Sequence, residues 1–343
     1  MSESSTQPIE ELLAENARLK EQNARLKEQN EASTRKAARA LAGYQNRALH
    51  MELIRQKNDQ LAQLNREIAD SLAQLKSTQD QLVEAARSAA LAEKEKLEKE
   101  LAIASRIQTS ILPRQFSVAG LEIAARMIPA TEVGGDYYDV LPVEGGAWLA
   151  IGDVAGHGLN AGLVMLMIQS VVAGLARQSP ESKPSEMLAV LNEVLFDNIR
   201  RRLDQRDYAT LSLLRYDSHT GGIVFSGAHE EIIVCREESG RCETIATPGP
   251  WLGAMPNVRR FAVNTPSQLN PNDVMLLYTD GVTEAMDAEG RQYGMERMCS
   301  ALEEVRHEPV ERIRDHLIDS VMTWTSTQMD DVTLVVIRQL AAA

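Results

Sequence analysis

The sequence of 343 residues is poor in aromatic side chains, which make up 4% of it, and has only three cysteines. Cys235, Cys242 and Cys299 form no Cys-x-x-Cys pair and are odd in number, so we expect reduced thiols, as in a cytosolic protein, instead of disulfides. The longest apolar run, residues 161–176, is broken by two polar residues and is too short to span a bilayer. The first residues also lack the apolar core of a secretion signal. These absences predict a protein of the cytoplasm with no membrane span.

Basic charge is in deficit as well, and the formal net charge is −13 at pH 7. The two signs balance in residues 1–112, so the C-terminal part carries the whole acidic excess. An acidic domain binds nucleic acid poorly and is a suitable place for divalent cations. We therefore expect no nucleic-acid partner.

Leucine and asparagine alternate near the N-terminus at the 4-3 spacing of a coiled-coil seam. The positions are Leu12, Asn16, Leu19, Asn23, Leu26 and Asn30. Asparagine in a seam lowers stability but favours two parallel strands, because the paired amides satisfy each other. The pattern predicts a parallel homodimer, whereas a single polar helix would give no reason for the repeat.

A second heptad series follows a break near residues 33–48. It consists of Ile54, Leu61, Ile68, Leu75, Leu82 and Ala89. The apolar positions then resume in a shifted phase at Leu97, Leu101, Ile107, Ile111 and Leu112, and Pro113 ends the helix. Such a shift changes the local winding, and it marks either a signalling joint or the end of the rod. We therefore divide the chain into a disordered leader (1–8), a coiled coil with a linker helix (9–112) and a globular domain (113–340).

Short apolar runs broken by Gly, Pro and Asp begin near residue 120 and predict strands. The runs are residues 121–128, 135–141, 148–154, 208–216, 222–225, 232–235, 258–263, 274–278 and 332–337. Helical patterns cover residues 159–176, 184–203, 293–305 and 309–323. Strands in runs separated by helix pairs favour antiparallel sheets covered by helices over regular βαβ winding.

Two carboxylates lie among glycines on neighbouring strands. Asp136 and Asp153 belong to runs joined by Glu144-Gly145-Gly146, which is a predicted hairpin turn. A hairpin of this kind brings both carboxylates to one end of a sheet. Two buried carboxylates repel each other unless they are protonated or bind a cation.

Further carboxylates stand at the ends of other strands. Asp280 follows the run 274–278, and Asp330 with Asp331 precedes the last run. One Asp at a strand end is usually a turn or cap residue. Four such sites in one domain, each beside an apolar run, favour a shared cation site. Ligation by oxygen alone fits Mg²⁺ or Mn²⁺ better than zinc.

These segments jointly resemble those of the SpoIIE-like, RsbU-type serine phosphatases in the metal-dependent protein phosphatase (PPM) family. The matching segments are residues 104–113 (ASRIQTSILP), 132–139 (EVGGDYYD), 152–158 (GDVAGHG), 277–285 (LYTDGVTEA) and 330–333 (DDVT). They appear in family order across about 104–338. The resemblance implies an α/β fold, a PPM-type sandwich of two antiparallel β-sheets flanked by α-helices, here preceded by a long α-helical coiled coil.

The same resemblance implies a centre of two manganese or two magnesium ions. It assigns Asp153 as the bridging ligand and the carbonyl of Val154 as a ligand of one metal. It further assigns Asp136 to one ion and Asp280 with Asp330 to the other, and places Asp331 nearby. The choice between Asp330 and Asp331 stays open.

The implied activity is hydrolysis of phosphoserine by a metal-activated water. The implied substrate is a STAS-type anti-sigma-factor antagonist in bacterial partner switching, and an upstream regulator could bind the coiled coil. His157 is a candidate general acid or positioning residue, and His229 lies in a candidate substrate loop. Two alternatives are a non-catalytic coiled-coil adaptor with a phosphatase-like domain and a metal-dependent nucleotide cyclase, which would leave Asp153 and Asp280 unexplained.

Overall fold

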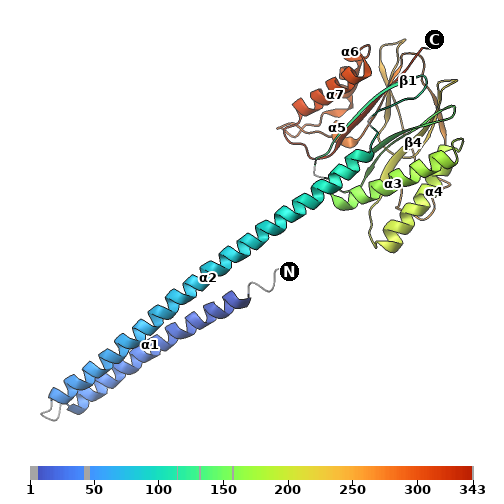
Figure 1. The fold of residues 1–343 in the computed structure, drawn as a ribbon. Helices are drawn as coiled ribbons and strands as arrows, with labels where there is room; N and C mark the ends of the chain where they lie inside the picture. The colour runs from blue at the N-terminus through green and yellow to red at the C-terminus, as the bar shows by residue number, and fades with distance from the viewer. Residues whose placement is uncertain (1–6, 42–46, 114, 131–132, 157, 342–343) are drawn as a thin grey trace. The chain divides into compact units, whose positions relative to one another are not determined.

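The computed structural model describes residues 7–41, 47–113, 115–130, 133–156 and 158–341 (Figure 1). The chain forms two units, Met1–Glu98 and Lys99–Ala343. The predicted boundary at residue 112 differs from this division, because the last turns of the long helix belong to the second unit. Most of the predicted leader lies outside the described residues.

Two long helices form the first unit. They are α1 (Gln7–Leu41) and α2 (Arg47–Ile111), which ends in the second unit. The two helices run side by side in opposite directions (Figure 1), and Leu26 and Asn30 of α1 line a narrow cleft with Lys57 and Leu61 of α2. The asparagine stripe, which the sequence assigned to a second chain, therefore packs against α2 of the same chain. Both helices carry apolar stripes of the same period, so they can pair within one molecule.

Two five-stranded antiparallel sheets form the centre of the second unit. The first sheet has the order β1-β10-β9-β6-β7 and the second the order β2-β3-β4-β5-β8. The strands of the first are β1 (Leu121–Ile128), β10 (Val332–Gln339), β9 (Val274–Tyr278), β6 (Ile232–Cys235) and β7 (Cys242–Ile245). Those of the second are β2 (Tyr137–Val143), β3 (Gly146–Val154), β4 (Ala209–Asp217), β5 (Gly222–Ser226) and β8 (Thr265–Gln268).

Helices cover the outer face of each sheet (Figure 1). The second sheet packs against α3 (Leu159–Gln178) and α4 (Pro184–Phe196), and a short π-helical segment, Asp197–Arg202, continues α4. The first sheet packs against α6 (Gly294–Val305) and α7 (Val310–Trp324), and the short α5 (Asp280–Thr283) follows β9. One core fills the space between the sheets and under α3 and α4, and a second lies under α6 and α7. The predicted sandwich is confirmed.

Helix α3 is the one described helix that is long and apolar enough to cross a membrane by length and composition. Here it serves as a core helix, because Val164, Met165 and Ile168 are buried against the sandwich. Leu159 and Leu163 on its other side are exposed. The apolar pattern of this helix is thus explained by packing.

Two strand predictions need correction. Residues 258–263 form turns and irregular structure instead of a strand, and β8, which the sequence did not predict, forms one edge of the second sheet. Val258 is buried, yet the segment lacks the alternation that a strand on a half-buried sheet shows. The sequence also gave no sign of β7, a four-residue edge strand with two exposed side chains, Glu243 and Thr244.

Candidate metal centre

The hairpin of β2 and β3 places the first two predicted ligands at one end of the second sheet. Val143 pairs with Gly146, so the turn is Glu144–Gly145, and Gly145 has a φ of 72° that favours glycine. At the other end the N–H of Val154 donates to the carbonyl of Gly135 at 3.3 Å. Asp136, just before β2, therefore lies beside Asp153, the next-to-last residue of β3. The predicted hairpin is confirmed.

The first sheet contributes the other carboxylates from two neighbouring strands. β9 ends at Tyr278, and Asp280 opens α5 two residues later. Asp330 and Asp331 immediately precede β10, which pairs with β9. The ends of β9 and β10 thus meet the ends of β2 and β3, and the five carboxylates gather where the two sheets face each other.

Asp136 joins the two sheets directly. Its Oδ2 accepts hydrogen bonds from the hydroxyl of Thr279 at 2.8 Å and from the hydroxyl of Thr333 at 2.5 Å. The side chain is buried, and burial followed by repulsion from Asp153 holds its pKa well above the ordinary value. A buried carboxylate with this surplus of negative neighbours is costly unless a proton or a cation is bound.

Asp331 holds the glycine turn in place. Its Oδ1 accepts from the N–H of Ala130 at 2.8 Å, and its Oδ2 accepts from the N–H of Gly135 at 2.8 Å. Gly134 must be glycine here, because a Cβ would stand 2.1 Å from that Oδ2. Both carboxylate oxygens of Asp331 are engaged with backbone, whereas Asp330 is exposed and accepts only the N–H of Asp331 among the bonds found.

Oxygen atoms converge on Gly135. A Cβ at this position would stand 2.8 Å from both Oδ1 of Asp153 and the carbonyl oxygen of Val154, and 3.3 Å from the carbonyl oxygen of Gly156. Two predicted ligand atoms therefore lie next to each other around a position that must stay free of a side chain. This cluster of backbone and carboxylate oxygens matches the donors that Mg²⁺ and Mn²⁺ prefer.

The electrostatics of the cluster also suit a cation. Burial, then the charges of Asp280, Asp330 and Asp331, raise the pKa of Asp153 to about 8. Burial and the charge of Asp330 likewise raise the pKa of Asp280. Burial and neighbouring carboxylates thus act in the same direction on each member of the cluster. Within the described residues no three His, Cys, Asp or Glu side chains are grouped as a ready coordination sphere.

Gln108, on the last turns of α2, was missed as a site residue by sequence reasoning. It is buried, its Nε2 donates to the carbonyl of Gly134 at 2.6 Å, and its Oε1 accepts the N–H of Gly134 at 3.0 Å. The glycine turn before Asp136 is thus held from both sides, by Gln108 and by Asp331. The only signal in the sequence was membership of the segment 104–113.

The two histidines that the sequence singled out, His157 and His229, differ in whether the structure describes them. His157 lies outside the described residues. The His229 ring lies between the two sheets: Nδ1 is 2.9 Å from the hydroxyl of Thr210, and Nε2 donates to the carbonyl of Tyr278 at 3.0 Å. Thr210 pairs with Asp153 in the register of β3 and β4. Burial lowers the pKa of His229 to about 4, so the ring is neutral and positions the strands that carry Asp153 and Asp280.

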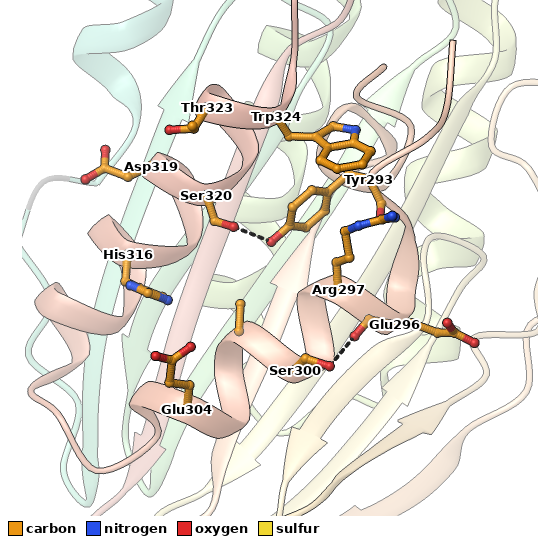
Figure 2. Close-up of a pocket in the computed structure, with 11 residues that line it drawn as sticks. Tyr293, Glu296, Arg297, Ser300, Glu304, His316, Asp319, Ser320, Thr323 and Trp324 are labelled. Atoms are coloured by element: carbon orange, nitrogen blue, oxygen red, sulfur yellow. Dashed lines mark hydrogen bonds between the residues drawn. The ribbon is translucent and has the colours of Figure 1, made fainter. Parts of the chain in front are cut away.

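An open groove of about 830 Å³ between α6 and α7 is a separate feature (Figure 2). The guanidinium carbon of Arg297 lies 4.0 Å from the ring centroid of Trp324, and the hydroxyls of Tyr293 and Ser320 are 2.8 Å apart. None of the predicted ligands lines this groove. The carboxylate cluster is therefore the better candidate for chemistry.

Comparison with known proteins agrees with this geometry. The family model described as Stage II sporulation protein E (SpoIIE) matches residues 144–340. The protein named phosphoserine phosphatase RsbU, from Bacillus subtilis (strain 168), is 26% identical over 257 residues, which are 71% of this chain and 71% of that protein.

Two solved structures share the fold of the second unit. The SiaA-PP2C domain of Pseudomonas aeruginosa has a TM-score of 0.62 at 21% identity and covers 72% of this chain and 98% of that domain. The catalytic domain of the serine threonine protein phosphatase PstP, in complex with two manganese ions, has a TM-score of 0.50 at 17% identity and covers 65% of this chain and 99% of that one. At these identities the likeness shows the arrangement of sheets and helices.

Proposed function

We propose that the chain hydrolyses phosphoserine on a STAS-type anti-sigma-factor antagonist. It belongs to the SpoIIE family and is a protein serine/threonine phosphatase of the RsbU type. The reaction uses a water activated at a centre of two Mn²⁺ or Mg²⁺ ions and belongs to bacterial partner switching. The observation that carries the proposal is the convergence of Asp153 Oδ1 and the Val154 carbonyl around Gly135, among carboxylates from both sheets.

The ligands would be divided as the resemblance implies, with one refinement. Asp153 and the Val154 carbonyl lie together and suit one shared position, and Asp136 stands beside them. Because both oxygens of Asp331 bind backbone N–H groups, we assign the remaining ligand position to Asp330, together with Asp280, and give Asp331 the role of brace. The PstP domain, which binds two manganese ions, has the same fold and supports the cofactor assignment.

The reaction chiefly requires that the protein hold a set of carboxylates in the correct positions. Cations held by these carboxylates would lower the pKa of a bound water and neutralise phosphoryl oxygens, so no cysteine or serine nucleophile would be required. The residues of the chain then act as positioning groups. Thr279 and Thr333 fix the carboxylate of Asp136, and His229 fixes the strands that carry Asp153 and Asp280.

The substrate class rests on the relative named phosphoserine phosphatase RsbU. We further propose that the protein works in the cytoplasm without nucleic-acid or membrane partners, and that an upstream regulator binds the helical rod. A homodimer is supported by Leu91 and Leu97 of α2, two apolar side chains that are exposed in the single chain. A monomer in light scattering at micromolar concentration would refute the dimer.

Phosphate release from a phosphoserine-bearing STAS-type protein tests the activity. The full chain should turn over this substrate with Mn²⁺ or Mg²⁺, and a chelator or the change Asp153→Asn should abolish turnover. Asp319→Asn is the matched control, because Asp319 is an exposed carboxylate on α7. Turnover of GTP without release from phosphoserine would favour the cyclase alternative, and failure to bind Mn²⁺ would favour the adaptor.

A further inference from the structure

The three cysteines of the chain gather at the far end of the first sheet from the carboxylates. Cys235 ends β6, Cys242 begins β7, and Cys299 lies on α6, which covers these strands. Cys235 pairs with Val274, whereas Asp280 follows the opposite end of β9. All three thiols are free; Cys235 is buried, and the other two are partly exposed.

Two of these thiols are direct cross-strand neighbours. Cys235 and Cys242 are opposite each other in the antiparallel register of β6 and β7. The next pair is hydrogen bonded, since the N–H of Arg236 donates to the carbonyl of Arg241 at 3.0 Å. Bonded and non-bonded pairs alternate, so Cys235 and Cys242 form a non-hydrogen-bonded pair with Cα atoms about 4.5 Å apart. A disulfide spans such a separation.

The third thiol is brought to the same place by α6. Oε1 of Glu303 accepts the backbone N–H of Cys242 at 2.8 Å, and Glu303 is four residues from Cys299 on the same face of the helix. The Cys242 thiol donates to the carbonyl of Cys299 at 3.6 Å, and both neighbouring cysteines influence its pKa. Cys242 is thus the central member of the cluster.

The surroundings of the three thiols differ. The neighbouring Cys242 lowers the pKa of the Cys299 thiol and, with help from Arg306, that of the Cys235 thiol. The two neighbouring cysteines and burial raise the pKa of Cys242. Cys299 therefore combines partial exposure with a stabilised thiolate, which are the two requirements for reaction with an oxidant.

The geometry places the three thiols side by side. Cys235 and Cys242 are opposite each other on paired strands, and the Cys242 thiol reaches the backbone of Cys299. Adjacent thiols can be oxidised to a disulfide.

We propose that Cys299, Cys242 and Cys235 form a redox relay that hydrogen peroxide converts to a Cys235–Cys242 disulfide. The Cys299 thiolate attacks one peroxide oxygen; an S–O bond forms, the O–O bond breaks, and the released hydroxide leaves as water after taking a proton. The Cys242 sulfur then attacks the sulfenic sulfur of Cys299, so that an S–S bond forms and the S–O bond breaks. The proton of Cys242 leaves with the hydroxide as a second water.

Thiol–disulfide exchange completes the relay. The Cys235 thiolate attacks the sulfur of Cys242 and releases the Cys299 thiolate, which takes up a proton. In the net reaction two thiols are oxidised to a disulfide, and one peroxide is reduced to two waters. The cross-strand pair is the end point, because its sulfurs are already held on adjacent, paired strands.

Disulfide mapping by mass spectrometry tests the relay on the full chain. After reduction, desalting and exposure to hydrogen peroxide, free thiols are alkylated and the protein is digested with trypsin without reduction. Cleavage after arginine places the three cysteines on separate peptides, residues 216–236, 242–259 and 298–306. We expect peptides 216–236 and 242–259 to be linked, and the oxidised protein to melt about 5 °C higher than the reduced one.

Variants separate the steps. In Cys235→Ser, oxidation should stop at a link between peptides 242–259 and 298–306. In Cys299→Ser, the final Cys235–Cys242 link should form at least five-fold more slowly than in the parent. In Cys242→Ser, neither link should form. Cys235→Ala repeats the first test with a side chain suited to a buried site, and cooperative melting in each reduced variant shows that the fold is retained.

Several results would overturn the proposal. No linked peptides in the parent would exclude the disulfide, and an unchanged rate in Cys299→Ser would exclude Cys299 as the first thiol to react. A link between peptides 216–236 and 298–306 in Cys242→Ser would remove Cys242 from the centre. One equivalent of zinc in the purified protein, with thiols that peroxide does not oxidise until the metal is removed, would make the cluster a metal site instead.

Discussion

The change Asp153→Asn should stabilise the metal-free protein and abolish its response to Mn²⁺. In the fold, burial and the charges of Asp280, Asp330 and Asp331 raise the pKa of Asp153 from 3.8 to about 8. An acid whose pKa is raised on folding binds its proton more tightly in the native state. The bound proton therefore contributes fully to the free energy of unfolding below about pH 4, and this contribution is lost as the pH rises towards 8.

The size of the effect follows from the shift. A pH of 7 is about three units above the pKa of the carboxyl in the unfolded chain. At about 1.4 kcal/mol per unit, ionisation disfavours the native state by at most about 4 kcal/mol. Asp153 is partly exposed, so solvent screening reduces this bound, and we expect Asp153→Asn to gain about 1–2 kcal/mol at pH 7. For a domain of this size that corresponds to a rise of about 5 °C in melting temperature.

Thermal unfolding of the full chain between pH 4.5 and 8, in a chelator and in Mn²⁺, is the assay. The metal-free parent should lose stability as the pH rises, and Asp153→Asn should show a shallower slope. Mn²⁺ at a hundred times its dissociation constant should raise the free energy of unfolding of the parent by about 3 kcal/mol, and its melting temperature with it, and should leave Asp153→Asn unchanged. Asp319→Asn should behave like the parent. A metal-free parent equally stable at pH 5 and pH 8, or an Asp153→Asn protein less stable than the parent, would refute the reasoning.

Three further predictions concern the supports of the site. Gly135→Ala should remove the Mn²⁺-induced rise in melting temperature and lower phosphatase turnover at least 100-fold. The reason is that the added Cβ would stand 2.8 Å from Asp153 Oδ1 and from the Val154 carbonyl. Gly174→Ala, where the added Cβ meets nothing within 4 Å, is the control. Gln108→Leu should cost about 1–3 kcal/mol of stability, since the backbone N–H and carbonyl of Gly134 both lose their hydrogen-bond partner. It should also weaken Mn²⁺ binding measured by calorimetry. Gln115→Leu, at an exposed position, should change neither quantity. One residue inserted between Ala89 and Leu101 turns the downstream helix by about 100° and should alter turnover several-fold, while seven inserted residues should alter it little; equal rates for both insertions and the parent would mean that the rod does not control the enzyme.

The elements that the sequence predicted well are those with strong local signals. β1, β6 and β9 have the predicted bounds, and the turn at Glu144–Gly145 is where two glycines follow a charged residue. β7 was missed because an edge strand of four residues with two polar side chains carries no apolar run. Residues 258–263 were taken for a strand because local composition does not reveal which apolar side chains pack within a loop.

The site residues divide in the same way, into features with a local sequence signal and features that depend on the fold. The aspartates were identifiable because each stands beside an apolar run, and the fold brings them together as expected. The separate roles of Asp330 and Asp331 depend on which N–H groups face each carboxylate, some of them about 200 residues away. The antiparallel packing of α1 on α2 likewise could not be read from heptads, because a stripe of one period suits a partner in the same chain or in another.

Strand β10 lies inside the first sheet, between the edge strand β1 and the central strand β9. Asp136 is fixed by hydroxyls that follow it by 143 and 197 residues, so its surroundings are complete only when Thr333 has joined the sheet. During synthesis, the helical rod leaves the ribosome long before that strand exists, and it is free to fold first. A nascent chain that stops before β10 lacks both Thr333 and the carboxylates of Asp330 and Asp331, so its carboxylate cluster is unfinished.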